Sequence, residues 1–320
     1  MNTQLTDDEV GILLAAAVHA PSMHNTQPWR FEVQGPVIDV LLDEERMLPL
    51  EDASGRALHI GVGAAVFNVR VAAAVLGHES RVAVHPDPVR PEVAARVFLA
   101  DRDVPVPGLS ELYGEVSQRH TYRGPLLDQQ IHPDVRRELD AAARAEGAEL
   151  HWLTSTADLR ALLRQTDDED LHDEARGVER HAWIGGDRSR DGVPENALGP
   201  VPVRPAFVRD LSAGFDSTHR SQAVYEAEPA IVVLAMPDEH IAAWVQAGLA
   251  LQHVLLTATS YGLAASFLDQ LLERPAPRAR VRDLIGGQAW PQMVIRIGYA
   301  AQSNGHTGRR DWHESFDRWF

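Results

Sequence analysis

Two periodicities of hydrophobic positions divide the first hundred residues into helices and strands. Apolar residues spaced three and four apart predict an amphipathic helix, whereas strict alternation predicts a half-buried strand. The sequence TDDE at 6–9 is a capping box that marks the start of the first helix. The pattern predicts, in order, a helix at 7–20, strands at 29–34 and 37–42, a long helix at 55–76, and strands at 81–85 and 96–100.

The rest of the chain repeats this mixture after a boundary marked by Pro105 and Pro107. The predicted helices lie at 108–119, 133–146, from about Thr156 onward, at 238–261 and at 280–285. The predicted strands lie at 149–154, 230–236, 264–268 and 292–300. Helices and strands are thus interspersed along the whole sequence.

Two long helical segments resemble each other. GAAVFNVRVAAAVLG runs from Gly63 to Gly77 and GLALQHVLLTATSYG runs from Gly248 to Gly262, so each glycine pair is 14 residues apart. Both segments are small or apolar on nearly all sides, which is typical of a helix buried on most faces. We interpret them as an internal duplication with halves at 1–105 and 106–320, and a chance resemblance is the alternative.

Residues 166–228 have no counterpart in the first half. The segment begins with the acidic run DDEDLHDE and then becomes rich in glycine and proline. Long segments of this kind inside compact domains are usually lids, binding loops or disordered excursions. We therefore treat 166–228 as an insertion that is either a lid over a site or a flexible surface loop.

The connector HAPSMHNTQPWRFEV at 19–33 carries a high density of polar side chains. Between its two prolines lie Ser22, His24, Asn25, Thr26 and Gln27. A structural turn, in which Ser22 and Asn25 satisfy nearby backbone groups, explains one or two of these residues. The remaining polar side chains indicate a second role, in binding.

Composition and charge narrow the possible functions. The chain has 30 basic and 46 acidic residues and a net charge of −16, which argues against a nucleic-acid partner because such binding relies on basic patches. No uninterrupted apolar run reaches about 18 residues, so no membrane partner is expected. The absence of cysteine excludes thiolate chemistry and, with the polar start MNTQLTDDEV, fits a cytoplasmic location. All basic residues are arginine, so a side-chain cation that holds an anion must be Arg or His.

Several short motifs suggest a binding or catalytic role, and they differ in how specifically they indicate it. The segment RHTYR at 119–123 can surround a phosphate through charge-assisted hydrogen bonds, but a solvated basic turn has the same composition. Gly61-Val62-Gly63 resembles a dinucleotide fingerprint that lacks its third glycine, because position 66 is valine. HExxH and GxSxG motifs are absent from the sequence, which disfavours metal-dependent and serine-hydrolase chemistry.

Three strings together resemble the nitroreductase family of FMN-binding proteins: PSMHNTQPWRF at 21–31, RHTYR at 119–123 and MVIRIGYA at 293–300. The resemblance implies an α+β, nitroreductase-like fold in which a mixed sheet is flanked by helices. Ordinary members are homodimers with FMN at the interface. Here the two motifs lie in different halves, which implies a monomer that acts as a pseudo-dimer and binds one FMN. The pattern is similar to the Acg-like branch, whose members are single-chain pseudo-dimers with a lid over the flavin.

The resemblance also implies roles for individual residues, all of them in cofactor binding and none of them catalytic. Arg119, Thr121 and Arg123 would hold the flavin phosphate, with Arg309 or Arg310 returning from the C-terminal segment. Pro21, Ser22, His24 and Asn25 would line the flavin from the other half, so this loop is expected to contact segment 119–123. Ser266, Phe267, Leu268, Asp269 and Gln270 would pass the flavin edge, where backbone N–H groups face N5.

Three functions fit these features. The favoured one is an oxidoreductase that passes hydride from NAD(P)H through FMN to a nitroaromatic or quinone-like acceptor, and because the cofactor carries the chemistry no protein nucleophile is required. The second is a non-catalytic protein that sequesters or stores FMN beneath the insertion. The third is a duplicated structural domain without a cofactor, which requires both basic clusters to be solvated turns.

Overall fold

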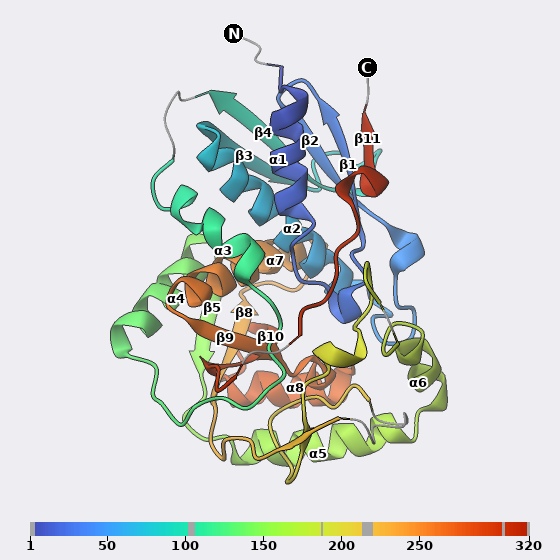
Figure 1. Cartoon of the computed structure of the whole chain (residues 1–320), viewed down its shortest axis with the longest axis vertical. Coiled ribbons are helices and arrows are strands. Elements are labelled where there is room, and N and C mark those ends of the chain that lie inside the picture. Colours follow the sequence, from blue (N-terminus) through green and yellow to red (C-terminus); the bar gives the residue numbers. More distant parts are fainter. Residues whose placement is uncertain (1–3, 102–105, 187, 213–219, 303–304, 319–320) are drawn as a thin grey trace.

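The chain folds into an α+β structure, seen here in a computed structural model that describes residues 4–101, 106–186, 188–212, 220–302 and 305–318 (Figure 1). The predicted boundary at Pro105 lies outside the described residues, as do positions 187 and 213–219 of the predicted insertion. The helices are α1 (Asp7–Ala17), α2 (Arg56–Val75), α3 (Tyr113–Gln118), α4 (Pro133–Ala145), α5 (Ala157–Leu171), α6 (Glu174–His181), α7 (Ile241–Ser260) and α8 (Pro275–Leu284). Short 3-10 turns include η1 (Met23–Asn25), η3 (Ser110–Leu112) and η5 (Asp269–Leu271).

Two larger sheets organise the fold, one in each predicted half. The first has the order β11-β1-β2-β4-β3 and is mixed, because β11 runs parallel to β1 while the other neighbours are antiparallel. The second has the order β5-β8-β10-β9 and is antiparallel throughout. The strands are β1 (Trp29–Gln34), β2 (Val37–Leu42), β3 (His78–Val84), β4 (Val93–Asp101), β5 (Glu149–Trp152), β6 (Val201–Pro202), β7 (Gln222–Ala223), β8 (Ala230–Met236), β9 (Leu263–Phe267), β10 (Trp290–Tyr299) and β11 (Phe316–Arg318).

The two longest helices, α2 and α7, meet between the sheets (Figure 1). A Cβ atom on Gly63 of α2 would lie 2.0 Å from the carbonyl oxygen of Val245, and one on Gly248 of α7 would lie 2.1 Å from that of Ile60. Each glycine thus faces the residue three positions before the other glycine. This reciprocal contact has the form expected of a two-fold axis, and it supports our interpretation of the segments as duplicates.

Burial of α2 and α7 explains their apolar composition. Both are long and apolar enough to cross a membrane by length and composition, yet 89% and 67% of their most apolar windows are buried inside the protein. A polar pair also joins the two helices: Gln252 Nε2 of α7 donates a 2.8 Å hydrogen bond to Asn68 Oδ1 of α2. This bond satisfies one donor of the Gln252 amide, while the Oε1 atom of the same side chain is buried without a hydrogen bond.

Local sequence signals place most element boundaries correctly. Thr6 and Glu9 form the predicted capping box, and Gly77 and Gly262 adopt the left-handed conformation expected after a helix, with φ of 82° and 70°. The last predicted helix, at 280–285, in fact begins at Pro275. Proline suits the first turn of a helix, where its missing N–H has no partner to lose, so the earlier start is physically reasonable.

The C-terminal segment crosses back to the first sheet, which the sequence pattern did not predict. Strand β11 pairs in parallel with β1, with Phe316 opposite Phe31. The predicted second half, 106–320, therefore ends in a strand that completes the sheet of the first half. The insertion is also more regular than expected, because it contains α6 and the short β6–β7 pair.

We predict that Gly63→Ala destabilises the protein by about 2 kcal/mol or more, because the added Cβ cannot fit against the backbone of α7 without separating the helices. Urea unfolding followed by circular dichroism measures the change. Gly114→Ala in α3 is the matched control: its Cβ would have no heavy atom within 4 Å, and replacing a helical glycine there should add up to about 1 kcal/mol. Equal stability of the Gly63 variant and the wild type would contradict the close crossing.

Candidate functional site

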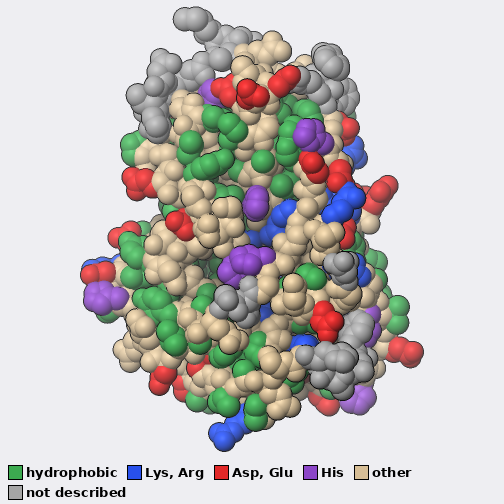
Figure 2. Space-filling view, viewed as in Figure 1, with side chains coloured by type: hydrophobic (Ala, Val, Ile, Leu, Met, Phe, Trp, Pro, Cys, Tyr) green, Lys and Arg blue, Asp and Glu red, His purple; other side chains and the backbone are tan. Residues whose placement is uncertain are grey.

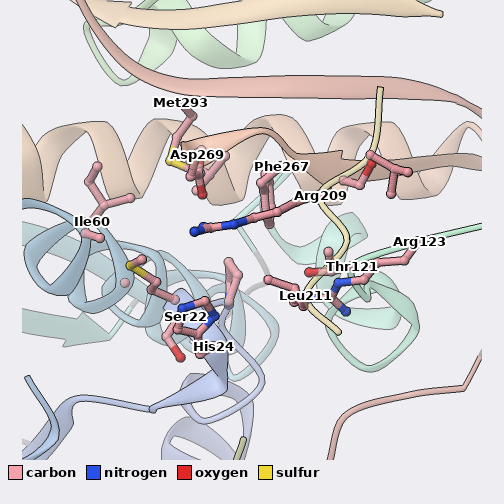
Figure 3. Close-up of a pocket in the computed structure, with 17 residues that line it drawn as sticks. Ser22, His24, Ile60, Thr121, Arg123, Arg209, Leu211, Phe267, Asp269 and Met293 are labelled. Atoms are coloured by element: carbon pink, nitrogen blue, oxygen red, sulfur yellow. The ribbon is translucent and has the colours of Figure 1, made fainter. Parts of the chain in front are cut away.

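A cavity of about 80 Å³ lies where the two predicted halves and the insertion meet (Figure 3). The residues that line it include Pro21, Ser22 and His24 from the first half, Thr121, Arg123, Ser266, Phe267 and Asp269 from the second, and Val208, Arg209 and Leu211 from the insertion. Segments far apart in sequence therefore build one concave site. Small-molecule sites commonly form at such junctions.

The loop that begins at Pro21 has a strained backbone. His24, Asn25 and Gln27 adopt the left-handed conformation, with φ of 47°, 57° and 54°. Such residues cost on the order of 1–3 kcal/mol each unless the surroundings fix them, and they cluster at functional sites. Ser22 makes the local contact that a turn requires, since its Oγ accepts a 2.9 Å hydrogen bond from the backbone N–H of Gln27.

The two amide side chains of this loop hold the insertion and the C-terminal segment. The Asn25 amide donates to the carbonyl oxygens of Gly192 and Gly308, each at 3.0 Å. The Gln27 amide donates to the carbonyl of Arg190 at 2.8 Å, and its oxygen accepts from the backbone N–H of Arg310 at 2.9 Å. The polar groups of the loop thus act largely in docking other segments of the same chain.

Contact between this loop and segment 119–123 is made by the arginine at the start of that segment. Arg119 Nη2 donates to the carbonyl oxygen of His19 at 3.1 Å, and Arg309 Nη2 donates to the same oxygen at 3.3 Å. Arg309 Nη1 also donates to Asn25 Oδ1 at 3.1 Å. Arg119 is 5% exposed, so the alternative of a solvated basic turn is wrong for this residue.

Three arginines at the site lack an anionic partner. Arg119, Arg123 and Arg309 form no ion pair with any carboxylate in the described part of the chain, and the Nε atoms of Arg119 and Arg309 are buried without a hydrogen bond. Burial lowers the pKa of Arg119 to about 9, aided by the charge of Arg309, and burial lowers the pKa values of Arg123 and Arg309 to about 10. Arg119 is buried, Arg123 and Arg309 are partly exposed, and Arg123 is the one of the three among the described residues that line the cavity. Guanidinium groups that have lost part of their hydration in this way favour binding of an anion that replaces it.

Histidines surround this arginine cluster, which we define as Arg119, Arg123 and Arg309. Burial and the nearby charges of Arg309 and Arg119 lower the pKa of His19 to about 4, so its ring is neutral at pH 7. The rings of His120 and His306 lie 4.1 Å apart between centroids. Figure 2 shows histidine and arginine side chains together in a depression on this face of the molecule. This local group of basic side chains contrasts with the net charge of −16 of the whole chain.

The other candidate arginine, Arg310, is directed elsewhere. Its Nη1 lies 3.8 Å from Asp43 Oδ2, and its Nε lies 3.6 Å from Glu314 Oε2. Its Nε and Nη1 are buried without a hydrogen bond, as are the Nε atoms of Arg119 and Arg309, but these two carboxylates lie close enough to form ion pairs with it. Of the two arginines that the sequence suggested as alternatives, Arg309 is the one that lies beside Arg119.

The segment after β9 contributes unequally to the cavity. Ser266 and Phe267 line it, and Ser266 Oγ accepts a 3.3 Å hydrogen bond from Arg296. Asp269 also lines it, and burial raises the pKa of its carboxyl to about 7. Leu268 instead packs in the hydrophobic core, and Gln270 Nε2 donates to Asp167 Oδ1 at 3.3 Å. Neither Leu268 nor Gln270 is among the described residues that line the cavity.

Arg209 of the insertion projects through the cavity, between Phe267 and Asp269 on one side and Ser22 and His24 on the other (Figure 3). Its guanidinium binds Glu273, and it also lies 3.2 Å from Glu51 Oε1 and 3.4 Å from Asp170 Oδ2. Burial alone would lower the pKa of Arg209, but Glu273 and Glu51 raise it well above its ordinary value. The insertion is therefore fastened across the site by ion pairs.

Glu51 links the ion pairs of Arg209 to the strained loop, because it contacts both Arg209 and His24. Its carboxylate binds His24 Nε2 on one oxygen and Arg180 Nε, at 2.7 Å, on the other. Burial alone would raise the pKa of Glu51, but His24, Arg209 and Arg180 hold it well below its usual range. The sequence alone did not indicate Glu51, Arg180 and Arg209 because they share no motif, although the acidic run at 167–174 was a signal that the insertion carries counter-charges such as Asp170.

Comparison with known proteins identifies similar sequences over nearly the whole chain. Residues 116–299 match the profile of the family described as "Nitroreductase family". The chain is 28% identical over 305 residues to "Putative NAD(P)H nitroreductase acg" of Mycobacterium tuberculosis, covering 94% of this chain and 92% of that protein. It is 31% identical over 315 residues to "Putative NAD(P)H nitroreductase Rv3131" of the same species, covering 94% of this chain and 88% of that protein.

Solved structures show a more distant likeness. A nitroreductase with bound FMN from Bacteroides fragilis aligns with a TM-score of 0.39 and 16% identity, covering 60% of this chain and 89% of that chain. A structure from Desulfovibrio desulfuricans described as "a putative nitroreductase in complex with fmn" aligns with a TM-score of 0.35 and 14% identity, covering 63% of this chain and 93% of that chain.

We predict that Gln27→Ala loosens the insertion and the C-terminal segment, because it removes the buried amide that bonds to both. The expected loss is about 1–3 kcal/mol of unfolding free energy and faster proteolysis near residues 190 and 310. Urea unfolding and limited proteolysis with mass spectrometry measure the two effects. Gln34→Ala is the control: Gln34 is the exposed last residue of β1, so its replacement should change neither quantity. If the two variants are cleaved at the same rate, the docking role of Gln27 is incorrect.

Proposed function

Because the chain belongs to the nitroreductase family, we propose that it binds one FMN between its two halves and acts as an NAD(P)H-dependent oxidoreductase. When bound, FMN supplies the redox chemistry, since it accepts hydride from NAD(P)H and passes it to a nitroaromatic or quinone-like acceptor. One chain supplies both walls of the cavity, so we expect a monomer that works as a pseudo-dimer with one FMN. The residues of this chain bind and position the reactants.

The arginine cluster is the observation that carries this proposal. A phosphate monoester provides the anionic oxygens that the unpaired Nε atoms of Arg119 and Arg309 lack. Arg123 and Thr121 lie on the same segment as Arg119 and line the cavity, which supports a role for them between the phosphate and the ring. We assign the phosphate to Arg119, Arg309, Arg123 and Thr121, and we exclude Arg310 because its charge is already paired.

The side chains that line the cavity are suited to a flavin ring, but the cavity is too small to hold one in this conformation. Its walls combine Pro21 and Ser22 with Ser266 and Phe267, an apolar surface with a few polar groups. Its volume of about 80 Å³ is smaller than the roughly 300 Å³ or more that ligand sites of this class need. Segment 208–211 must therefore move outward when FMN enters.

A second function is favoured by the ion pairs of Arg209. A segment held across the site by Glu273, Glu51 and Asp170 can close over bound FMN and keep NAD(P)H out. The protein would then store or sequester FMN without turnover. The same phosphate contacts serve both functions, so the difference between them lies in how readily 208–211 opens.

Absorption spectroscopy of the purified protein tests these alternatives. We predict flavin bands corresponding to one FMN per chain, after addition of FMN if needed, and bleaching of these bands when NAD(P)H is added without oxygen. A flavin that binds at this ratio but resists bleaching by NADH and NADPH, while dithionite bleaches it, establishes the storage function instead. A protein that takes up no FMN refutes both.

Arg119→Ala tests the phosphate assignment. We predict that FMN affinity falls at least about 30-fold, or about 2 kcal/mol, because a buried charged partner is removed. Affinity for riboflavin, which is FMN without its phosphate, should stay the same, and fluorescence quenching measures both. Arg310→Ala is the matched control and should keep FMN affinity within about threefold, since Arg310 faces Asp43 and Glu314. An equal loss for FMN and riboflavin would show that Arg119 acts on the ring or the fold instead.

A further inference from the structure

Asp269 places an unused carboxyl oxygen at the cavity. The residue follows β9 directly, lines the cavity and has its Oδ1 atom buried without a hydrogen-bond partner. A backbone hydrogen bond from Val294 reaches the same carboxyl group. Figure 3 shows Asp269 on the wall opposite Ser22 and His24. Asp269 is partly exposed and lines the cavity, so a ligand there can reach the residue, while its Oδ1 atom is enclosed by the protein.

The charged groups around Asp269 are engaged with other partners. Arg56 of α2 donates to the carbonyl oxygen of Gln292 at 2.6 Å, and Arg209 of the insertion is bound by Glu273 and Glu51. His24 on the opposite wall is bound by Glu51. Arg56 and Arg209 favour the ionised carboxyl and Glu273 opposes it, but burial outweighs them and raises the pKa to about 7. Asp269 is thus a partly exposed acid at the cavity, without a cation dedicated to it among the described residues.

A protonated carboxyl at this position supplies an O–H donor beside the cavity that the residue lines. An unpaired buried acceptor oxygen is costly, whereas an O–H group satisfies a ligand oxygen or nitrogen. Acids that work near neutral pH are commonly carboxyl groups held in such poorly solvated positions. Leu268 and Gln270, the neighbours of Asp269, point into the core and toward Asp167, so Asp269 alone of these three residues meets the ligand.

We propose that Asp269 is a catalytic acid, which donates a proton to the oxygen of the bound acceptor. The proposal rests on the proposed function, because it needs an acceptor reduced in this cavity. It also revises the expectation that the protein only binds the cofactor. Asp269 would be the group of this chain that takes part in the chemistry directly.

The proton balance of the reaction requires such a donor. Reduction of a quinone to a hydroquinone takes two electrons and two protons. Hydride that originates from NAD(P)H brings both electrons and one proton, and the second proton must reach the quinone oxygen. The O–H bond of Asp269 breaks, the O–H bond of the hydroquinone forms, and the carboxylate left behind regains its proton from water when segment 208–211 opens.

Asp269→Asn tests the proposal, because asparagine matches the neutral acid in size and charge but cannot release a proton. After anaerobic bleaching with NAD(P)H, the FMN-loaded protein is mixed with a quinone in a stopped-flow spectrometer. We expect the rate of quinone reduction to fall about 100-fold or more, with FMN affinity and the rate of bleaching within about threefold of the wild type. Asp140→Asn on α4 is the control of equal charge change, since its carboxyl accepts from Trp152 away from the cavity and should leave all three quantities unchanged.

Two further measurements test the acid role without using the rate of quinone reduction by the Asp269→Asn variant. The wild-type rate of quinone reduction should fall as pH rises through about 7, because the acid form is required. In flavin-free protein, the infrared band of a protonated carboxyl that Asp269→Asn removes should disappear over the same pH range. Wild-type kinetics in the variant, or a carboxyl already ionised at pH 6, overturns the acid role. Failure of the wild type to take up FMN refutes the proposed function itself, whereas normal uptake and bleaching with unchanged variant kinetics refutes the acid role alone.

Discussion

The contact between α2 and α7 at Gly63 and Gly248 is the constraint from which the site follows. Backbone carbonyls occupy the space that side chains would take at these two positions, so the helices cross at contact distance. That approach brings the loop after α1, together with α2, against β9 and β10, and a cavity opens between them. The site is thus a consequence of how two similar halves pack, and residues within one half alone would not form it.

Electrostatics divides the site into two ends with opposite character. At one end Arg119, which is buried, lies near Arg309, and neither has a carboxylate partner among the described residues, which suits a phosphate. At the other end Arg209 is surrounded by Glu51, Asp170 and Glu273, which fixes the insertion in place. His24 stands at the junction, because its ring binds Glu51 while its strained backbone belongs to the loop that holds Arg309 through Asn25. Movement of the insertion and occupation of the anion end are therefore linked through a short chain of contacts.

Local rules allowed much of the fold to be predicted, and non-local contacts account for what was missed. Thr6 with Glu9 and the glycines at 77 and 262 mark helix ends by chemistry that acts within a few residues. The spacing of apolar residues likewise identified α2 and α7. Strand β11 is only three residues long, too short for a period, and it is stabilised by a parallel partner almost the whole chain away. The family resemblance indicated Arg119 and Arg309 as candidate site residues. The partners of Asn25, Gln27 and Arg209 could not be predicted, because they lie on segments that meet only after folding.

The course of the C-terminal segment sets an order of events during synthesis. Arg309 directly precedes Arg310, whose backbone N–H is held by Gln27, and it lies a short way before strand β11, which is bound to β1. It is the last member of the arginine cluster to leave the ribosome. The first half apart from its edge strand β11, most of the second half and the insertion have been synthesised by then, while Arg309 and β11 have not. If Arg309 holds the cofactor as proposed, cofactor capture is a late step, coupled to the closing of a sheet that began to form at the start of the chain.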